Sequence, residues 1–167
     1  MNDKETVKRA RAGDKDAFAS LYMQHKDSLY RYAYFKLNSE ADAQDAVSNA
    51  IVAAYSAIGT LKSEKAFTSW LFSILYRECC TVLRRRCETG IPAQLSEADT
   101  AQPCTSLMAP ELREALAILQ SDEKDIVLLS VIAGYNSREI AEMLQLNPAT
   151  VRSKRMRSLK KMRDFLE

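Results

Sequence analysis

Apolar residues recur every three or four positions through the first half of the chain, which is the spacing of amphipathic helices. A first stripe lies within residues 14–36 and consists of Phe18, Leu21, Tyr22, Leu29, Tyr32 and Ala33. Ser39, with Asp42 three residues later, can cap a second helix. The apolar face of that helix consists of Val47, Ile51, Ala54 and Ile58.

Residues 59–65 interrupt this spacing, and Ser63 can cap a third helix that continues to about Arg86. The core positions of this helix are Phe67, Trp70, Leu71, Ile74, Leu75 and Val82. Three consecutive helices, each with one apolar face, predict a helical bundle for the first part of the chain.

Four shorter helices are predicted in the last third of the chain, at residues 111–119, 122–133, 138–146 and from 148 onward. Their start signals are, in order, Pro110, Ser121, Ser137 and Asn147 followed by Pro148, and Gly134 can end the second. Ile140, Ala141 and Leu144 share one face of the third, and Val151 begins the buried face of the fourth. A small residue at position 141 lets these two helices cross closely, which predicts a helix-turn-helix.

Residues 89–110 contain three of the four prolines and no Lys or Arg, so they are predicted to form an extended, mobile connector. The predicted fold is therefore all-α, with two small helical domains, residues 1–88 and 111–167, joined by a flexible linker. No apolar run is long enough to cross a bilayer, and the first 13 residues are too charged for a signal peptide. We expect a cytoplasmic protein with reduced cysteines, and neither a metal site nor a cofactor.

Positive charge is concentrated near the end of the chain. Residues 148–163 carry seven basic side chains and no acidic one, although the net charge of the whole chain is only +2. The second helix of a helix-turn-helix places its first residues in the DNA major groove. Near the bases we expect Thr150, Arg152, Ser153 and Lys154, and near the phosphates Arg155, Arg157, Lys160 and Lys161. The alternative is a two-helix corner with a solvated basic end.

Three segments together resemble a known family. "EIAEMLQLNPATVRSKRMRSLKKMRDFL" resembles the C-terminal domain of bacterial extracytoplasmic-function (ECF) sigma factors, the small initiation subunits of RNA polymerase. "DAQDAVSNAIVAAYSAI" resembles the polymerase-binding helix of that family, and "FTSWLFSILYRECCTVLRRR" resembles its promoter-engaging helix. Each motif is loose, but their order and their combination are specific, and the resemblance covers nearly the whole chain.

The resemblance implies three binding surfaces. A polymerase-binding surface would consist of Asp42, Asp45, Ser48 and Asn49. A surface for the melted −10 element would be formed by the loop at residues 59–66 and the helix that follows it. Its residues would be Lys62, Lys65, Trp70, Arg77, Arg84 and Arg85. A surface for the −35 element would consist of Thr150, Arg152, Ser153, Lys154, Arg155 and Arg157. The implied partners are core RNA polymerase, promoter DNA and an anti-sigma factor, with no small-molecule substrate.

Two of these assignments have a plainer alternative. Trp70 can be a stacking platform for a base, or it can anchor the core between helices. The arginines at positions 77 and 84–86 can follow a phosphate backbone, or they can form a solvated helix end favoured by the helix dipole.

The chain departs from the family pattern at several positions. Ser48 and Asn49 stand where the family usually has Gln-Glu, and Tyr76-Arg77, with Thr81, where it commonly has Arg-Asn and then Asp. Gln145 stands at a turn position where the family usually has Gly, so the turn is either strained, at a cost on the order of 1–2 kcal/mol, or shaped differently. Arg155, four residues after Val151, stands where the family normally has an apolar residue.

Other functions remain open at this point. The chain could be a sigma-like DNA-binding regulator that does not load polymerase, or a protein that sequesters polymerase. Catalysis by the chain itself is not expected, because it has no glycine-rich phosphate loop, no HExxH motif and no nucleophile with a nearby base in a recognisable spacing.

Overall fold

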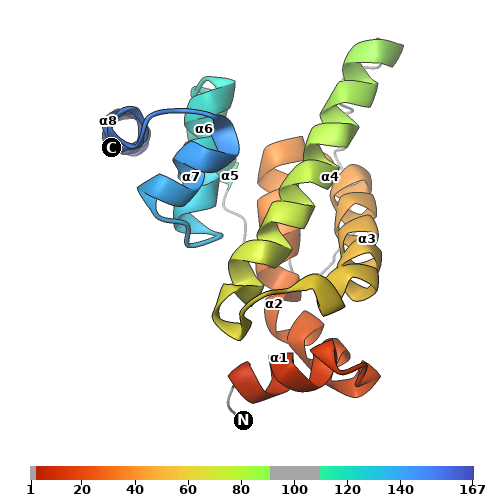
Figure 1. Ribbon diagram of the computed structural model, residues 1–167. Coiled ribbons are helices and arrows are strands. Elements are labelled where there is room, and N and C mark those ends of the chain that lie inside the picture. Colours follow the sequence, from red (N-terminus) through yellow and green to blue (C-terminus); the bar gives the residue numbers. More distant parts are fainter. Residues whose placement is uncertain (1–2, 91–109) are drawn as a thin grey trace. The chain divides into compact units, whose positions relative to one another are not determined.

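The computed structural model describes residues 3–90 and 110–167, and every regular element in them is helical (Figure 1). The chain divides into two compact units, unit 1 (Met1–Ala98) and unit 2 (Asp99–Glu167). The predicted all-α class with two helical domains is therefore confirmed. Apart from Thr89, Gly90 and Pro110, the predicted connector lies outside the described residues, as does Cys104. No described helix is long and apolar enough to span a membrane.

Unit 1 is a bundle of three long helices crossed by a short one. The long helices α2 (Lys15–Leu37), α3 (Glu40–Ala57) and α4 (Phe67–Thr89) pack on one another, and α1 (Asp3–Arg11) packs on α2. Two single turns, η1 (Ile58–Thr60) and η2 (Glu64–Ala66), join α3 to α4. In Figure 1 the C-terminal turns of α4 extend beyond α2 and α3. Helix α1 was not among the elements predicted from the sequence.

The core of unit 1 follows the predicted apolar stripes. Leu21, Leu29, Leu71 and Leu75 are at most 1 % exposed, and the rings of Tyr32 and Phe72 meet edge to face at 5.8 Å between their centroids. The predicted core residues that stay partly exposed are Tyr22, Ile51, Trp70 and Val82.

Local hydrogen bonds explain where the helices of unit 1 begin. The Asp14 carboxylate accepts the N–H groups of Asp16 and Ala17 at the start of α2, and the Ser39 hydroxyl accepts that of Asp42 at the start of α3. The prediction that Ser63 caps the third helix is wrong. Ser63 precedes η2 without a capping side-chain hydrogen bond, and α4 begins only at Phe67, because the chain forms a tighter turn first.

Unit 2 consists of α5 (Pro110–Ala117), α6 (Ser121–Val131), α7 (Ser137–Leu144) and α8 (Pro148–Leu166). Helix α8 packs against the other three. Ile126, Leu129, Ile140 and Val151 are at most 1 % exposed and form the centre of its core. Val151 is thus fully buried in the first turn of α8, and α7 packs on α8, which agrees with the predicted helix-turn-helix.

Two predicted caps of unit 2 lie one residue too late. Asn136, not Ser137, caps α7, since its side chain accepts the Glu139 N–H at 2.9 Å and the Glu139 carboxylate accepts the Asn136 N–H at 2.8 Å. Likewise Gln120, not Ser121, precedes α6, and its N–H donates to the Glu123 carboxylate at 3.0 Å. A Glu at the third helical position reaches back to the residue before the helix, which displaces the serine from that role. Asn147 caps α8 as predicted.

The turn between α7 and α8 is strained rather than reshaped. Gln145 has φ 56° and ψ 46°, which is the left-handed conformation that glycine adopts at least cost. The N–H of Leu146 donates to the carbonyl of Ala141 at 2.9 Å and completes a common C-terminal helix ending.

Candidate nucleic-acid and partner interfaces

Helix α8 has one buried side and one charged side. Val151, Ser158 and Met162 are 0 %, 0 % and 7 % exposed and lie along the buried side. Arg152, Ser153, Met156, Arg157 and Lys160 are exposed, and Met156 is 74 % exposed. A helix that offers cations and apolar methyl groups from its outer side can contact phosphates and base edges.

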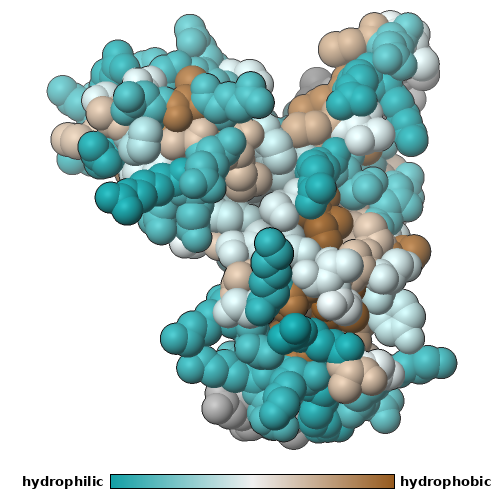
Figure 2. Space-filling model, viewed as in Figure 1, coloured by the Kyte–Doolittle hydropathy of each residue, from teal (hydrophilic) through white to brown (hydrophobic). Residues whose placement is uncertain are grey.

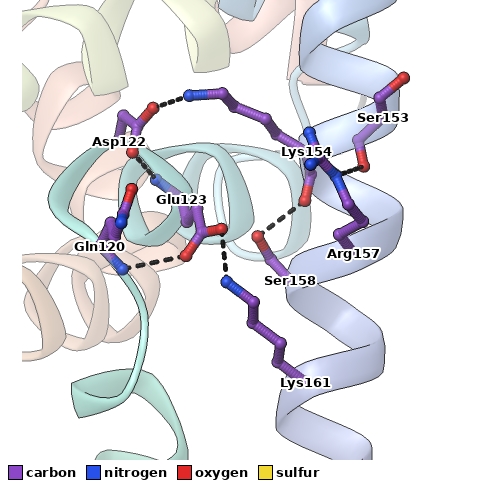
Figure 3. A network of polar contacts seen from close by, with 8 residues as sticks. All are labelled: Gln120, Asp122, Glu123, Ser153, Lys154, Arg157, Ser158 and Lys161. Carbon is purple, nitrogen blue, oxygen red and sulfur yellow. Dashed lines mark hydrogen bonds and ion pairs between the residues drawn. The ribbon is translucent and has the colours of Figure 1, made fainter.

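Two of the seven cations of α8 are turned toward α6 instead (Figure 3). The Lys154 ammonium pairs with the Asp122 carboxylate, and the Lys161 ammonium donates to Glu123 at 2.8 Å. These two lysines are seven residues apart and therefore share one side of the helix. The hydrogen bond from Lys154 lowers the pKa of Asp122, and that from Lys161, followed by the Gln120 N–H, lowers the pKa of Glu123.

The residues predicted for the −35 surface thus differ in their placement. Arg152, Ser153, Arg155 and Arg157 are exposed, and Thr150 is half-buried in the first turn of α8. Lys154 is the exception, because it is half-buried and paired with Asp122. No local sequence pattern predicts this pair, because the two residues are 32 positions apart.

The residues predicted for the −10 surface are mostly exposed. Lys62 and Lys65 lie in the loop before α4, and Arg77, Arg84 and Arg85 lie along α4. On the face of unit 1 drawn in Figure 2, hydrophilic side chains gather toward the ends, and side chains of intermediate or apolar character lie between them. These exposed cations are suited to contacts with a polyanion.

Trp70 is neither fully buried nor free. It is half-buried, and its ring lies against Phe67 with 6.0 Å between centroids and a tilt of 39°. The contact with Phe67 helps to pack the start of α4. This contact agrees with the core-anchor alternative, and a stacking role for Trp70 stays a prediction.

Two residues outside the predicted sites contact the turn before α4 and the start of α4. Arg11 of α1 pairs with Glu64 of η2. His25 of α2 bonds the Leu21 carbonyl at 2.8 Å and the Thr68 hydroxyl at 3.2 Å, with its ring edge-on to Phe67 at 5.6 Å. Both contacts join residues more than 40 positions apart, so no local sequence signal predicts them.

The arginine triplet at the end of α4 is divided. Arg84 and Arg85 are exposed, whereas Arg86 is directed into the bundle. Its guanidinium bonds the Asp42 carboxylate, with 3.1 Å from Nε to Oδ2, and donates to the Leu37 carbonyl at 2.8 Å. Asp42, predicted as a polymerase contact, therefore has an internal partner.

The outer side of α3 remains open to a partner protein. Asp45, Ser48 and Asn49 are exposed, and the same side continues to Val52 and Tyr55, which are 67 % and 45 % exposed. We call these five residues the α3 face. It combines one carboxylate, two short polar side chains and two apolar ones, which is a composition suited to a protein contact.

The described residues contain no group of His, Cys, Asp or Glu side chains that could hold a metal ion. Cys79 is buried, Cys80 is partly buried and Cys87 is exposed.

Comparison with known proteins identifies both units. Residues 21–88 match the sigma-70 region 2 family, and residues 110–162 match the sigma-70 region 4 family. The ECF RNA polymerase sigma factor SigM of Mycobacterium tuberculosis is 30 % identical over 92 % of this chain and 79 % of its own length. The ECF RNA polymerase sigma factor BldN of Streptomyces coelicolor is 29 % identical over 97 % of this chain, which spans 65 % of BldN.

A solved structure has the same fold. It is the sigma factor RpoE in complex with the anti-sigma factor NepR from Bartonella quintana, with a TM-score of 0.73 and 18 % identity over 89 % of this chain and 96 % of the other. The family suggested by the three sequence segments is confirmed by the matches to both sigma regions and by SigM, which is 30 % identical. The chain belongs to the ECF sigma factors of bacterial RNA polymerase.

Proposed function

We propose that this sigma factor binds core polymerase through the α3 face, contacts the −35 element with α8 and engages the −10 element with the loop before α4 and with α4 itself. The observation that carries the proposal is the order of regions 2 and 4 in one chain, each with exposed polar or cationic side chains on an outward helix. Sigma factors are initiation factors, and nucleotidyl transfer belongs to the polymerase. We place the protein in the bacterial cytoplasm, where the polymerase acts.

Duplex binding by α8 is supported by its geometry within unit 2. The major groove is about as wide as a helix with its side chains, and the first turns of α8 offer Arg152, Ser153 and Arg157 from its open side. Arginine forms bidentate hydrogen bonds with guanine, and serine accepts or donates at several bases. We therefore assign sequence recognition to Arg152 and Ser153, and phosphate contacts to Arg155 and Arg157.

Contact with the −10 element is supported by the arrangement of α4. Arg77 and Arg84 are seven residues apart and share one side of the helix, while Trp70 lies two turns before Arg77 on the same helix. One aromatic ring followed by spaced cations suits a single strand whose bases stack while its backbone follows the charges.

The α3 face is the surface that we assign to core polymerase. Asp45 supplies its one charge, and Val52 and Tyr55 supply apolar area that would be removed from water on binding. Arg86 holds Asp42, so we assign Asp42 a structural role beside this contact.

An anti-sigma factor is the third partner that we propose. The RpoE structure with the same fold contains an anti-sigma factor, NepR. Such a partner would control this chain by covering the surfaces that bind polymerase.

The proposal is tested by retrieving core RNA polymerase from the native host with a tagged chain and by run-off transcription on a library of genomic fragments. We expect stable association and discrete start sites. Asp45→Arg reverses the charge of the α3 face and should abolish association, whereas Glu5→Arg, the same reversal on exposed α1, should not. An Asp45→Arg chain that still assembles at wild-type affinity would show that the contact lies elsewhere.

The second candidate is a sigma-like regulator that binds DNA alone. Ser48 and Asn49 favour it, because they are shorter and carry less charge than the Gln-Glu usual at these positions. Duplex binding without polymerase association in the same experiment would select this candidate.

A further inference from the structure

The Asp122–Lys154 pair lies on the side of α8 next to its DNA-facing residues (Figure 3). Asp122 belongs to the first turn of α6, where a carboxylate is favoured by the helix dipole. Its Oδ1 accepts the Glu123 N–H at 2.9 Å, and its Oδ2 meets the Lys154 ammonium. The two side chains are 39 % and 27 % exposed, so water and ions reach the pair.

Lys154 differs from the neighbouring cations of α8 because its ammonium is paired with a carboxylate. Arg152 and Arg155, on either side of it, make no ion pair within the described residues. A cation that is already paired with a carboxylate releases few counterions when DNA arrives. It therefore adds little to the salt dependence of binding.

We propose that Asp122 is a positioning residue of the DNA interface, which holds Lys154 on α6 and keeps it off the phosphate backbone. This inference rests on the proposed function, because it assumes that α8 meets duplex DNA. Without Asp122, the flexible Lys154 side chain is able to turn from α6 to a phosphate. The duplex contacts of the natural protein then rest on the arginines and Lys160, which have no acidic partner on α6.

The test is the salt dependence of duplex binding by the full chain, with Asp122→Asn as the central variant. Asparagine keeps Oδ1 as the acceptor for the Glu123 N–H, so the start of α6 is preserved. Binding to a mixed-sequence duplex is followed by fluorescence anisotropy over a series of salt concentrations. A new phosphate contact by Lys154 should steepen the slope of log K against log salt by about 0.9, with tighter binding at low salt.

Two matched variants separate this effect from the general loss of a negative charge. Asp164→Asn makes the same change in net charge on α8, at an exposed residue that has no ion pair among the described residues. It should leave the slope near that of the natural protein. In Asp122→Asn/Lys154→Ala the steeper slope should disappear, because the released ammonium is gone.

The outcomes divide clearly. A steeper slope in Asp122→Asn that is lost in the double variant supports the proposal. The proposal is overturned if Asp122→Asn has an unchanged slope or binds more weakly, or if the steeper slope persists in the double variant that lacks Lys154. In each of these cases the proposed DNA contact of α8 still stands, provided that the natural chain binds the duplex. If the natural chain binds no duplex even at low salt, the proposed function of α8 fails first and this inference fails with it.

Discussion

Gln145→Gly should stabilise unit 2 without changing its DNA contacts. Gln145 is exposed and sits at φ 56° and ψ 46°, where a residue with a Cβ is strained by about 1–2 kcal/mol. Glycine removes that strain but gains freedom in the unfolded chain, which costs about 0.4–1 kcal/mol. The net gain should be about 0.5–1 kcal/mol. The backbone hydrogen bond from Leu146 to Ala141 is kept, so the angle between α7 and α8 should not change.

Native-state hydrogen exchange measures this gain within the intact chain. The peptides that cover α7 and α8 should exchange roughly twofold to fivefold more slowly in Gln145→Gly, since 1 kcal/mol corresponds to a factor of about five. Asn38→Gly is the matched control in unit 1, because Asn38 has φ 51° and ψ 37°. Asparagine tolerates this conformation better than glutamine does, so its replacement should leave the exchange of α2 and α3 nearly unchanged.

Faster or equal exchange of α7 and α8 in Gln145→Gly would refute the reasoning. It would mean that the left-handed residue is not strained in this turn, or that the glutamine side chain supplies an interaction that offsets the strain. Weakened duplex binding by the variant would show that the turn had changed shape.

Three further predictions concern the charged pairs. Arg86→Ala should lower the free energy of unfolding of unit 1 by about 2 kcal/mol, because it leaves the Leu37 carbonyl and the Asp42 carboxylate without this donor. The control Arg85→Ala should change the free energy of unfolding by less than about 0.5 kcal/mol. Both values can be measured from the fluorescence of the single tryptophan, which lies in α4. The pKa of the Glu123 carboxyl is lowered in the folded state, so this carboxylate contributes fully to stability above its ordinary pKa of 4.5, and the contribution is lost as the pH falls below that value. Glu123→Gln should therefore flatten the pH dependence of unit 2 unfolding in that acid range. An equally steep loss of stability in the variant would assign the effect to other carboxylates. Arg152→Ala should weaken binding to a promoter duplex and relax its sequence preference more than Lys154→Ala does, and equal effects in a competition assay would contradict the placement of Lys154 on α6.

Patterns within a single helix were predictable from the sequence. The apolar stripes located the cores because burial follows helical spacing, and Asn147-Pro148 located the start of α8 because both residues act locally. Glu139 could have corrected the predicted start of α7, since a Glu at the third helical position favours a cap at Asn136. A capping serine one position later competes with this signal when the sequence is read alone.

Contacts between helices were not predictable in the same way. Helix α1 buries only Thr6, Val7 and Ala10, which is too short a stripe to stand out in a highly charged segment. The Arg11–Glu64 pair joins positions 53 residues apart. Its formation depends on how α1 packs, and one sequence alone carries no record of that packing.

In both clusters of cations, at the end of α4 and along α8, some basic side chains are paired with acidic residues of the same unit. The burial of each pair determines how easily the basic side chain can leave it. Arg86 is 16 % exposed and would give up a carbonyl as well as a carboxylate if it turned outward. It therefore remains part of the bundle, and in the proposed −10 contact the charge at the end of α4 would come from Arg84 and Arg85. Lys154 is 27 % exposed and would give up only Asp122, itself 39 % exposed, so its pair is the one that replacement of Asp122 alone can open. A count of basic residues in the sequence overstates the charge offered to DNA at both places, but only at Lys154 can a single substitution restore it.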